Sequence, residues 1–78
     1  MRRRGLKLII AFSTTTYALK MEHLCKEKEI PGRLIPTPRE ISAGCGFVWC
    51  TEIVYKQCIL EVLDQAHITP DGIYEMQL

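Results

Sequence analysis

The spacing of apolar residues changes several times along this chain, and the order of the changes restricts the fold more than any single motif. Continuous or alternating apolar runs, typical of β-strands, give way to three- and four-residue spacing, typical of helices. The 78 residues predict six elements in the order strand, helix, strand, strand, helix, strand. That order predicts an α+β, ferredoxin-like split βαβ fold (βαββαβ), a four-stranded antiparallel sheet with two helices on one face.

Local signals give each element its expected bounds. The hydroxyls of residues 13–16 can cap a first helix, which we expect to begin near Tyr17 and to end at Pro31-Gly32. Thr51 is expected to cap the second helix. The buried stripe of that helix is predicted to be Tyr55, Ile59, Val62, Leu63 and Ala66. The expected strands are 7–12, 33–35, 46–50 and 73–76.

Composition indicates one globular domain, residues 6–78, after a basic tail at residues 1–5. The chain is 47% hydrophobic and 24% charged, too apolar for a disordered protein. Its net charge of +1 provides no strong field for nucleic acid or for an anionic membrane surface. A core of this size supplies little net stability, so homodimerisation would help the fold.

The N-terminal sequence has the outline of an export signal, with Arg2–Arg4 followed by apolar residues. However, Lys7 interrupts the apolar run, and no small-x-small cleavage site precedes the threonines. No stretch approaches the ~20 apolar residues that cross a bilayer. We therefore expect a cytoplasmic protein with reduced thiols and no membrane partner.

The predicted topology sorts the loops between the two ends of the sheet. Right-handed crossovers make the first two strands parallel, with the third between them and antiparallel to both. One end should gather residues 13–16, the loop 37–45 and the turn 67–72. Pro31-Gly32 and the Cys50-Thr51 junction should lie at the opposite end.

Cys45 is the predicted site residue, because it lies in the longest irregular stretch between Gly44 and Gly46. Glycines leave the backbone permissive, and long loops in compact domains are often functional. The alternative is that Cys45 has only a structural role. Sequence chemistry supports it equally well, because cysteine in a small domain is commonly a compact apolar residue.

The topology places the Cys45 loop beside the N-terminus of the first helix, at Thr14 and Thr15. The positive end of the helix dipole favours a thiolate, and Arg39 in the same loop could add a second positive charge. His67 is a weaker candidate. Such surroundings lower a thiol pKa from about 8.5 toward ~3.5–7.5.

The other cysteines predict neither a metal nor a cofactor site. Cys25 and Cys58 fall on or beside helix stripes and are interpreted as structural. Cys50 could be reactive, but at the opposite end from Cys45, so a disulfide between them is disfavoured. The cysteine spacings form no paired Cys-x2-Cys set for zinc.

The segment 43–49 follows the outline of an RNA-recognition strand. Ala43 replaces its basic residue and Cys45 its first stacking aromatic, so nucleic acid is a disfavoured partner. Phe47 and Trp49 share one face of the predicted strand. We interpret that face as core or as a self-association surface.

One run resembles a known family. It reads Arg33-Leu34-Ile35-Pro36-Thr37-Pro38-Arg39-Glu40-Ile41-Ser42-Ala43-Gly44-Cys45-Gly46. It resembles small bacterial domains of unknown function named as selenium/sulfur carrier-like, and the C-terminal part of a sulfurtransferase-like selenium-metabolism protein. Further matches are Phe12-Ser13-Thr14-Thr15, Ala18-Leu19, Glu22 and Gly72-Ile73-Tyr74. The resemblance implies a persulfide or selenium adduct on Cys45, with Arg39 and Ser42 shaping the loop.

Two functional hypotheses follow. In the first, the chain carries sulfur or selenium on Cys45 between donor and acceptor proteins, as a protein co-substrate more than a stand-alone enzyme. In the second, it is a noncatalytic interaction or regulatory module that docks through the Phe47/Trp49 face or through the proline-rich loop, and its cysteines are structural.

Overall fold

The structure, a computed structural model, describes residues 6–41 and 46–77. The six predicted elements occur in the predicted order, with one extra helical turn. Their bounds are β1 Lys7–Ala11, α1 Thr15–Glu27, β2 Arg33–Pro36, β3 Phe47–Glu52, the 3-10 turn η1 Ile53–Tyr55, α2 Lys56–Gln65 and β4 Gly72–Met76. The expected basic tail, together with Ser42, Gly44 and Cys45, lies outside the described residues.

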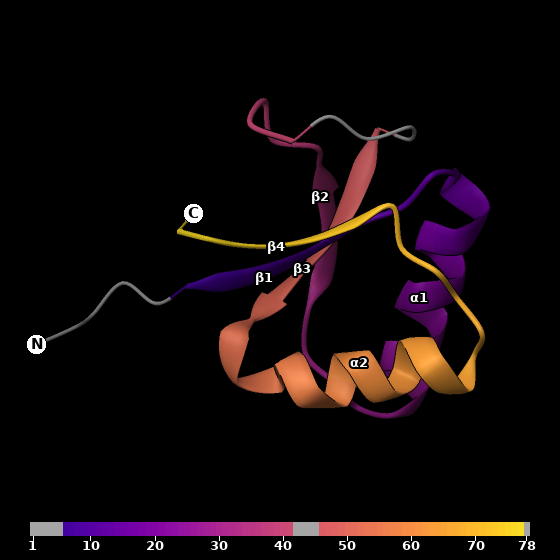
Figure 1. The fold of residues 1–78 in the computed structure, drawn as a ribbon. Helices are drawn as coiled ribbons and strands as arrows, with labels where there is room; N and C mark the ends of the chain where they lie inside the picture. The colour runs from indigo at the N-terminus through magenta and orange to yellow at the C-terminus, as the bar shows by residue number, and fades with distance from the viewer. Residues whose placement is uncertain (1–5, 42–45, 78) are drawn as a thin grey trace, which may run out of the picture.

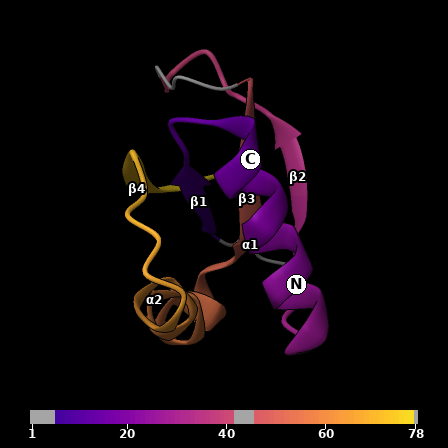
Figure 2. The ribbon, with the colours of Figure 1, turned by 90° about the vertical axis from the view of Figure 1, so that its right-hand side faces the viewer.

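The four strands form one antiparallel sheet in the order β2-β3-β1-β4. As predicted, β3 lies between β1 and β2 and runs antiparallel to both. Figures 1 and 2 show the two helices on the same side of the sheet. Their buried residues join one core cluster with side chains of β1 and β3. The fold class is therefore α+β, with a helical layer on one face of the sheet.

Strand β1 is the centre of the core because both of its faces are buried. Leu8 and Ile10 face the helices, whereas Ile9 and Ala11 face the other side, and all four are fully buried. On the side without helices, Ile41 from the loop after β2 packs against this second cluster. Each fully buried Leu or Ile contributes about 1.5–3 kcal/mol. This explains why β1 reads as a continuous apolar run.

Helix α1 begins two residues earlier than predicted and ends four residues before Pro31. Thr14 is the N-cap, and its Oγ1 accepts a hydrogen bond from the Tyr17 N–H at 3.4 Å. At the other end, Glu29 has the left-handed φ of 59°. The N–H groups of Glu29 and Ile30 donate to the carbonyls of the last helical turn. This Schellman arrangement, not Pro31-Gly32, ends the helix.

Thr51 does not cap the second helix, so that prediction was wrong. It belongs to β3, is 4% exposed, and its hydroxyl donates to the Pro31 carbonyl at 2.6 Å. The turn η1 follows, and α2 begins only at Lys56. The predicted stripe of α2 is otherwise correct: Ile59, Val62 and Leu63 are buried, and Tyr55 and Ala66 pack partly buried against the same cluster.

Gly32 is required by the packing of Trp49. The indole of Trp49 is 2% exposed and lies against the backbone of Gly32. A Cβ at position 32 would lie 2.5 Å from Trp49 Cζ2 and 2.9 Å from the Cys50 carbonyl oxygen. The φ of Gly32 is 152°, which L-residues rarely adopt. The chain that connects α1 to β2 therefore passes Trp49 only without a side chain.

Gly32→Ala is expected to destabilise the protein by about 2–3 kcal/mol, because it adds both backbone strain and a clash with Trp49. Gly46→Ala is the matched control, since a Cβ there meets nothing within 4 Å. Urea unfolding followed by Trp49 fluorescence measures both variants. Equal stability of the two would contradict the packing of Trp49 on Gly32.

Cys25 should make stability fall at alkaline pH. It is fully buried, and burial raises the pKa of its thiol from 9.0 to about 11. The unfolded chain ionises first, so the stability present below pH 9 is lost as pH rises through 11. The advantage of wild type over Cys25→Ala should shrink by about 2–3 kcal/mol across this range. Unfolding curves at pH 8 and pH 11 test it, and an unchanged difference would refute it.

Candidate functional site

The described residues on either side of the predicted site lie where β1 and β2 end and β3 and β4 begin. The Thr37 N–H donates to the Gly46 carbonyl at 3.0 Å, which joins the two described ends of the loop that contains Cys45. At the same end of the sheet, the Asp71 N–H donates to the Ala11 carbonyl at 2.7 Å. The described part of this loop and the β1–α1 junction therefore share one end, as predicted, at the top of Figure 1.

The first half of the loop forms a turn, after which Ile41 is buried against the sheet. The Ile41 N–H donates to the Pro38 carbonyl at 3.0 Å, which closes a turn over Arg39 and Glu40. Ile41 is 5% exposed and packs against Val48, whereas Arg39 faces solvent. The loop is thus anchored on the helix-free face of the sheet, and its cation is exposed.

The other predicted site residues divide into two groups. Thr14 and Thr15 are exposed at the start of α1, and Gly46 has open space around its Cα. Their roles beside a thiolate stay predictions. Ser42, Gly44 and Cys45 lie outside the described residues.

His67 does not lie where the sequence suggested. It follows Ala66, the C-cap of α2, and has a left-handed φ of 58°; the N–H groups of His67 and Ile68 close that helix. The end of α2 lies at the bottom of Figures 1 and 2, whereas the described part of the Cys45 loop lies at the top. Only the later part of the turn, at Asp71, reaches that end of the sheet. His67 is therefore a helix-closing residue.

The remaining cysteines differ in their surroundings. Cys25 is a core residue, as predicted. Cys58 is exposed on α2, so the prediction of a structural role for it was wrong. Cys50 lies within β3, two residues before the strand ends, and is half-buried on the helix-free face. Cys50 lines a hollow of the surface, and Cys58 lines a smaller one of about 230 Å³ beside Glu61 and Gln65.

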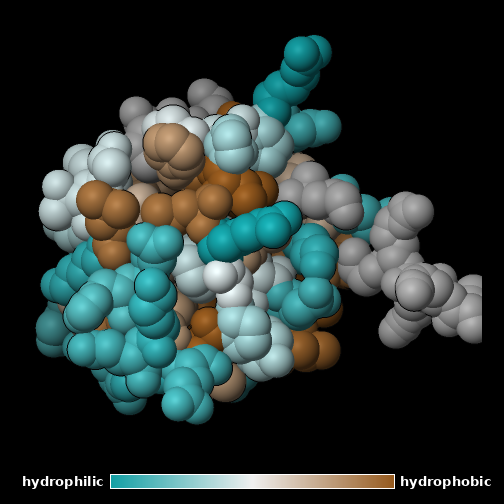
Figure 3. All heavy atoms as spheres, turned by 180° about the vertical axis from the view of Figure 1, so that it is seen from behind, coloured by the Kyte–Doolittle hydropathy of each residue, from teal (hydrophilic) through white to brown (hydrophobic). Residues whose placement is uncertain are grey.

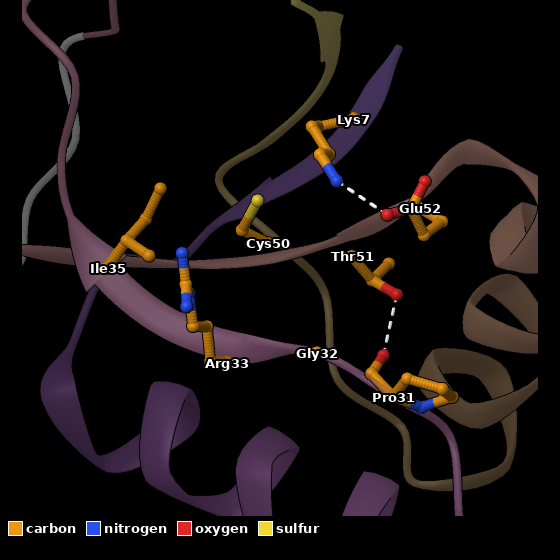
Figure 4. Close-up of a pocket in the computed structure, with 8 residues that line it drawn as sticks. All are labelled: Lys7, Pro31, Gly32, Arg33, Ile35, Cys50, Thr51 and Glu52. Carbon is orange, nitrogen blue, oxygen red and sulfur yellow. Dashed lines mark hydrogen bonds and ion pairs between the residues drawn. The ribbon is translucent and has the colours of Figure 1, made fainter. Parts of the chain in front are cut away.

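The hollow at Cys50, here the Cys50 groove, measures about 560 Å³. It is lined by Lys7, Pro31, Gly32, Arg33, Ile35, Cys50, Thr51 and Glu52. In Figure 4 the sulfur of Cys50 points between the amine of Lys7 and the guanidinium of Arg33. Sequence reasoning noted Cys50 as a second thiol but missed this cationic setting.

Strand register explains the setting. Arg33 is paired directly opposite Cys50, and Lys7 is paired opposite Glu52. Side chains opposite each other on antiparallel strands have Cβ atoms about 4.5–5.5 Å apart, and diagonal ones remain within reach of long side chains. Lys7 Nζ lies 2.5 Å from Glu52 Oε2. Arg33 has no ion-pair partner among residues 6–41 and 46–77.

Burial and the neighbouring charges together set the pKa of the Cys50 thiol. Burial raises the pKa of the Cys50 thiol above its ordinary value, and Glu52 raises it further. Lys7 and Arg33 lower it, but burial prevails. The thiol is thus held mainly protonated near neutral pH, with two cations beside it that would stabilise a negative charge.

The Phe47/Trp49 face is not available as a docking surface. Trp49 lies in the core beneath the helices, although Phe47 is 46% exposed. The interpretation of this face as core is confirmed for Trp49, and docking through the pair of aromatics was wrong. Figure 3 shows hydrophobic residues gathered across the middle of the rear surface, above a mainly hydrophilic lower part.

Two negative findings hold for residues 6–41 and 46–77. No group of three or more His, Cys, Asp or Glu side chains in these segments could hold a metal ion. Within the same segments, no helix has the length and apolar character needed to span a membrane.

Glu52→Gln is expected to lower the pKa of Cys50, because it removes a negative charge and releases Lys7 from its ion pair. Alkylation of Cys50 near neutral pH should become faster, since the thiolate is the reactive form. Mass spectrometry of the Cys50 peptide over a pH series measures the shift. Asp64→Asn, a change on exposed α2, should leave the profile unaltered. A Glu52→Gln profile that matches wild type would contradict this electrostatic account.

Searches of curated proteins and of solved structures give no match. A family model described as "Putative Se/S carrier protein-like" matches residues 7–75. The match extends from β1 to β4 and includes the whole loop that contains Cys45. The chain therefore belongs to this Se/S carrier protein-like family.

Proposed function

We propose that the protein is a sulfur or selenium carrier that holds a persulfide or a selenium adduct on Cys45. The observation that carries the proposal is the family match over residues 7–75, which includes the Cys45 loop. The geometry of the described residues supports it, because the ends of that loop and the N-terminus of α1 lie at the same end of the sheet. A helix N-terminus favours a negative charge such as a thiolate.

The transfer is a thiol exchange that needs no oxidant. The thiolate of Cys45 attacks the outer sulfur of a persulfide on a donor protein. The donor S–S bond breaks, the donor leaves as a thiolate, and Cys45 holds the outer sulfur as a persulfide. The same exchange in the opposite direction delivers the sulfur to an acceptor. In this scheme the chain is a co-substrate of two enzymes.

The partners are donor and acceptor proteins, and the compartment is cytoplasmic, where thiols are reduced. We also infer that the fold is the ferredoxin-like split βαβ arrangement. The element order and the antiparallel strand order β2-β3-β1-β4 support this inference. One end of such a sheet gathers separate loops.

Cys45→Ser should retain the fold and lose the adduct, because the hydroxyl cannot form a persulfide. The measurement is incubation with a low-molecular-weight persulfide donor, followed by alkylation and peptide mass spectrometry. Cys58→Ser is the matched control, because Cys58 is exposed on α2 and lies outside the proposed site. Far-UV circular dichroism verifies the fold of both variants. Sulfur capture by Cys45→Ser at the wild-type level would refute the assignment.

A further inference from the structure

The Cys50 groove combines a thiol, a guanidinium without an ion-pair partner among residues 6–41 and 46–77, and space for a small molecule. The groove has a volume of about 560 Å³ and opens on the helix-free face of the sheet. It lies at the end where β3 ends and β2 begins. The loop that contains Cys45 begins at the other end of β2. The groove is therefore a second place on the chain, distinct from the described part of the Cys45 loop.

The charge of the groove selects an anion. Lys7 and Arg33 contribute two positive charges and Glu52 one negative charge, which leaves one positive charge in excess. Glu52 pairs with Lys7, so the guanidinium of Arg33 keeps its donors available within the described residues. A guanidinium presents a planar fork of N–H donors that matches the oxygens of an oxyanion. An anion held on the Arg33 side would also avoid the Glu52 carboxylate.

The thiol restricts the anion to one that can react with it. Figure 4 shows the Cys50 sulfur between Lys7 and Arg33, so an oxyanion on Arg33 would lie beside that sulfur. We propose that the Cys50 groove is a loading site for small sulfur-bearing oxyanions of the thiosulfate class, with Cys50 as the accepting thiol. This role adds a small-molecule sulfur source to the protein donors of the proposed function, and it does not depend on Cys45.

The reaction balances without a further reagent. The Cys50 thiol gives up its proton, and the thiolate, which Lys7 and Arg33 stabilise, attacks the outer sulfur of thiosulfate and forms an S–S bond. The S–S bond of thiosulfate breaks, and its electron pair leaves with the sulfite group. The thiol proton passes to sulfite, so that Cys50–SH and thiosulfate give a Cys50 persulfide anion and hydrogen sulfite. Arg33 holds the sulfonate oxygens, and the proton that burial retains on Cys50 leaves with the product.

The test uses the full chain with Cys45→Ser, so that loading of Cys50 is measured alone. Sodium thiosulfate is the probe, and alkylation with peptide mass spectrometry locates the added sulfur. Cys50 should gain one sulfur atom, whereas exposed Cys58 should stay unmodified at the same thiosulfate concentration. Sulfate, which has the oxyanion but no outer sulfur, should compete with loading.

Two charge variants separate a built site from general thiol reactivity. Arg33→Gln should raise the half-saturating thiosulfate concentration about tenfold, because a charge-assisted contact is lost. Lys20→Gln, which removes an exposed charge on α1, should change nothing. Amide NMR spectra verify that both variants fold. The proposal would be overturned if Cys58 were loaded as fully as Cys50, or if Cys50 were not loaded. It would also be overturned if Arg33→Gln had the same half-saturating thiosulfate concentration as the chain with Arg33.

Failure of this proposal is distinguishable from failure of the carrier function. In a Cys50→Ser chain, loading of Cys45 by a persulfide donor reports on the carrier function alone. In the Cys45→Ser chain, loading by thiosulfate reports on the groove alone. Loss of one activity leaves the other measurable.

Discussion

The antiparallel pairing of β1 with β3 is the constraint on which the rest of the molecule depends. It joins Lys7 to Glu52 and Ile9 to Cys50 across the centre of the sheet. Because side chains alternate between faces, this one register turns Trp49 toward the helices and Cys50 toward the groove. A slip of one residue would exchange the two faces, bury the charge of Glu52 and expose the indole. Core and groove are therefore consequences of the same pairing.

The connection between α1 and β2 links the core to the groove. The left-handed residue Glu29 ends the helix early enough for Pro31 and Gly32 to pass the edge of β3. There the Pro31 carbonyl accepts the Thr51 hydroxyl, and Gly32 lies against Trp49. The same two residues line the Cys50 groove. The packing of the Trp49 indole against Gly32 therefore fixes the position of one side of the groove. The local sequence pattern predicted neither this contact nor the groove.

Much of the fold could be predicted from the sequence because its signals are local. Apolar spacing gave the order of the elements, and the threonine run gave the capping residue Thr14. Predictions failed where tertiary contacts decide. Thr51 has a good capping side chain, but β3 continues through it because its backbone pairs with Leu8. His67 was placed by loop order, whereas its left-handed backbone ties it to the end of α2.

The two cysteine sites differ in the same respect: one depends on local sequence signals and the other on tertiary contacts. Cys45 is proposed from its glycines and its loop, which are local features of the sequence. The groove could not, because Arg33, Lys7 and Cys50 are far apart in sequence and meet only through strand register. Arg33 pairs with Cys50 at one end of β2, and the loop with Cys45 begins after Pro36 at the other, about 10 Å away along an extended strand. A disulfide needs Cα atoms about 4.4–6.8 Å apart. Cys50 and the described start of the Cys45 loop are therefore farther apart along β2 than a disulfide spans.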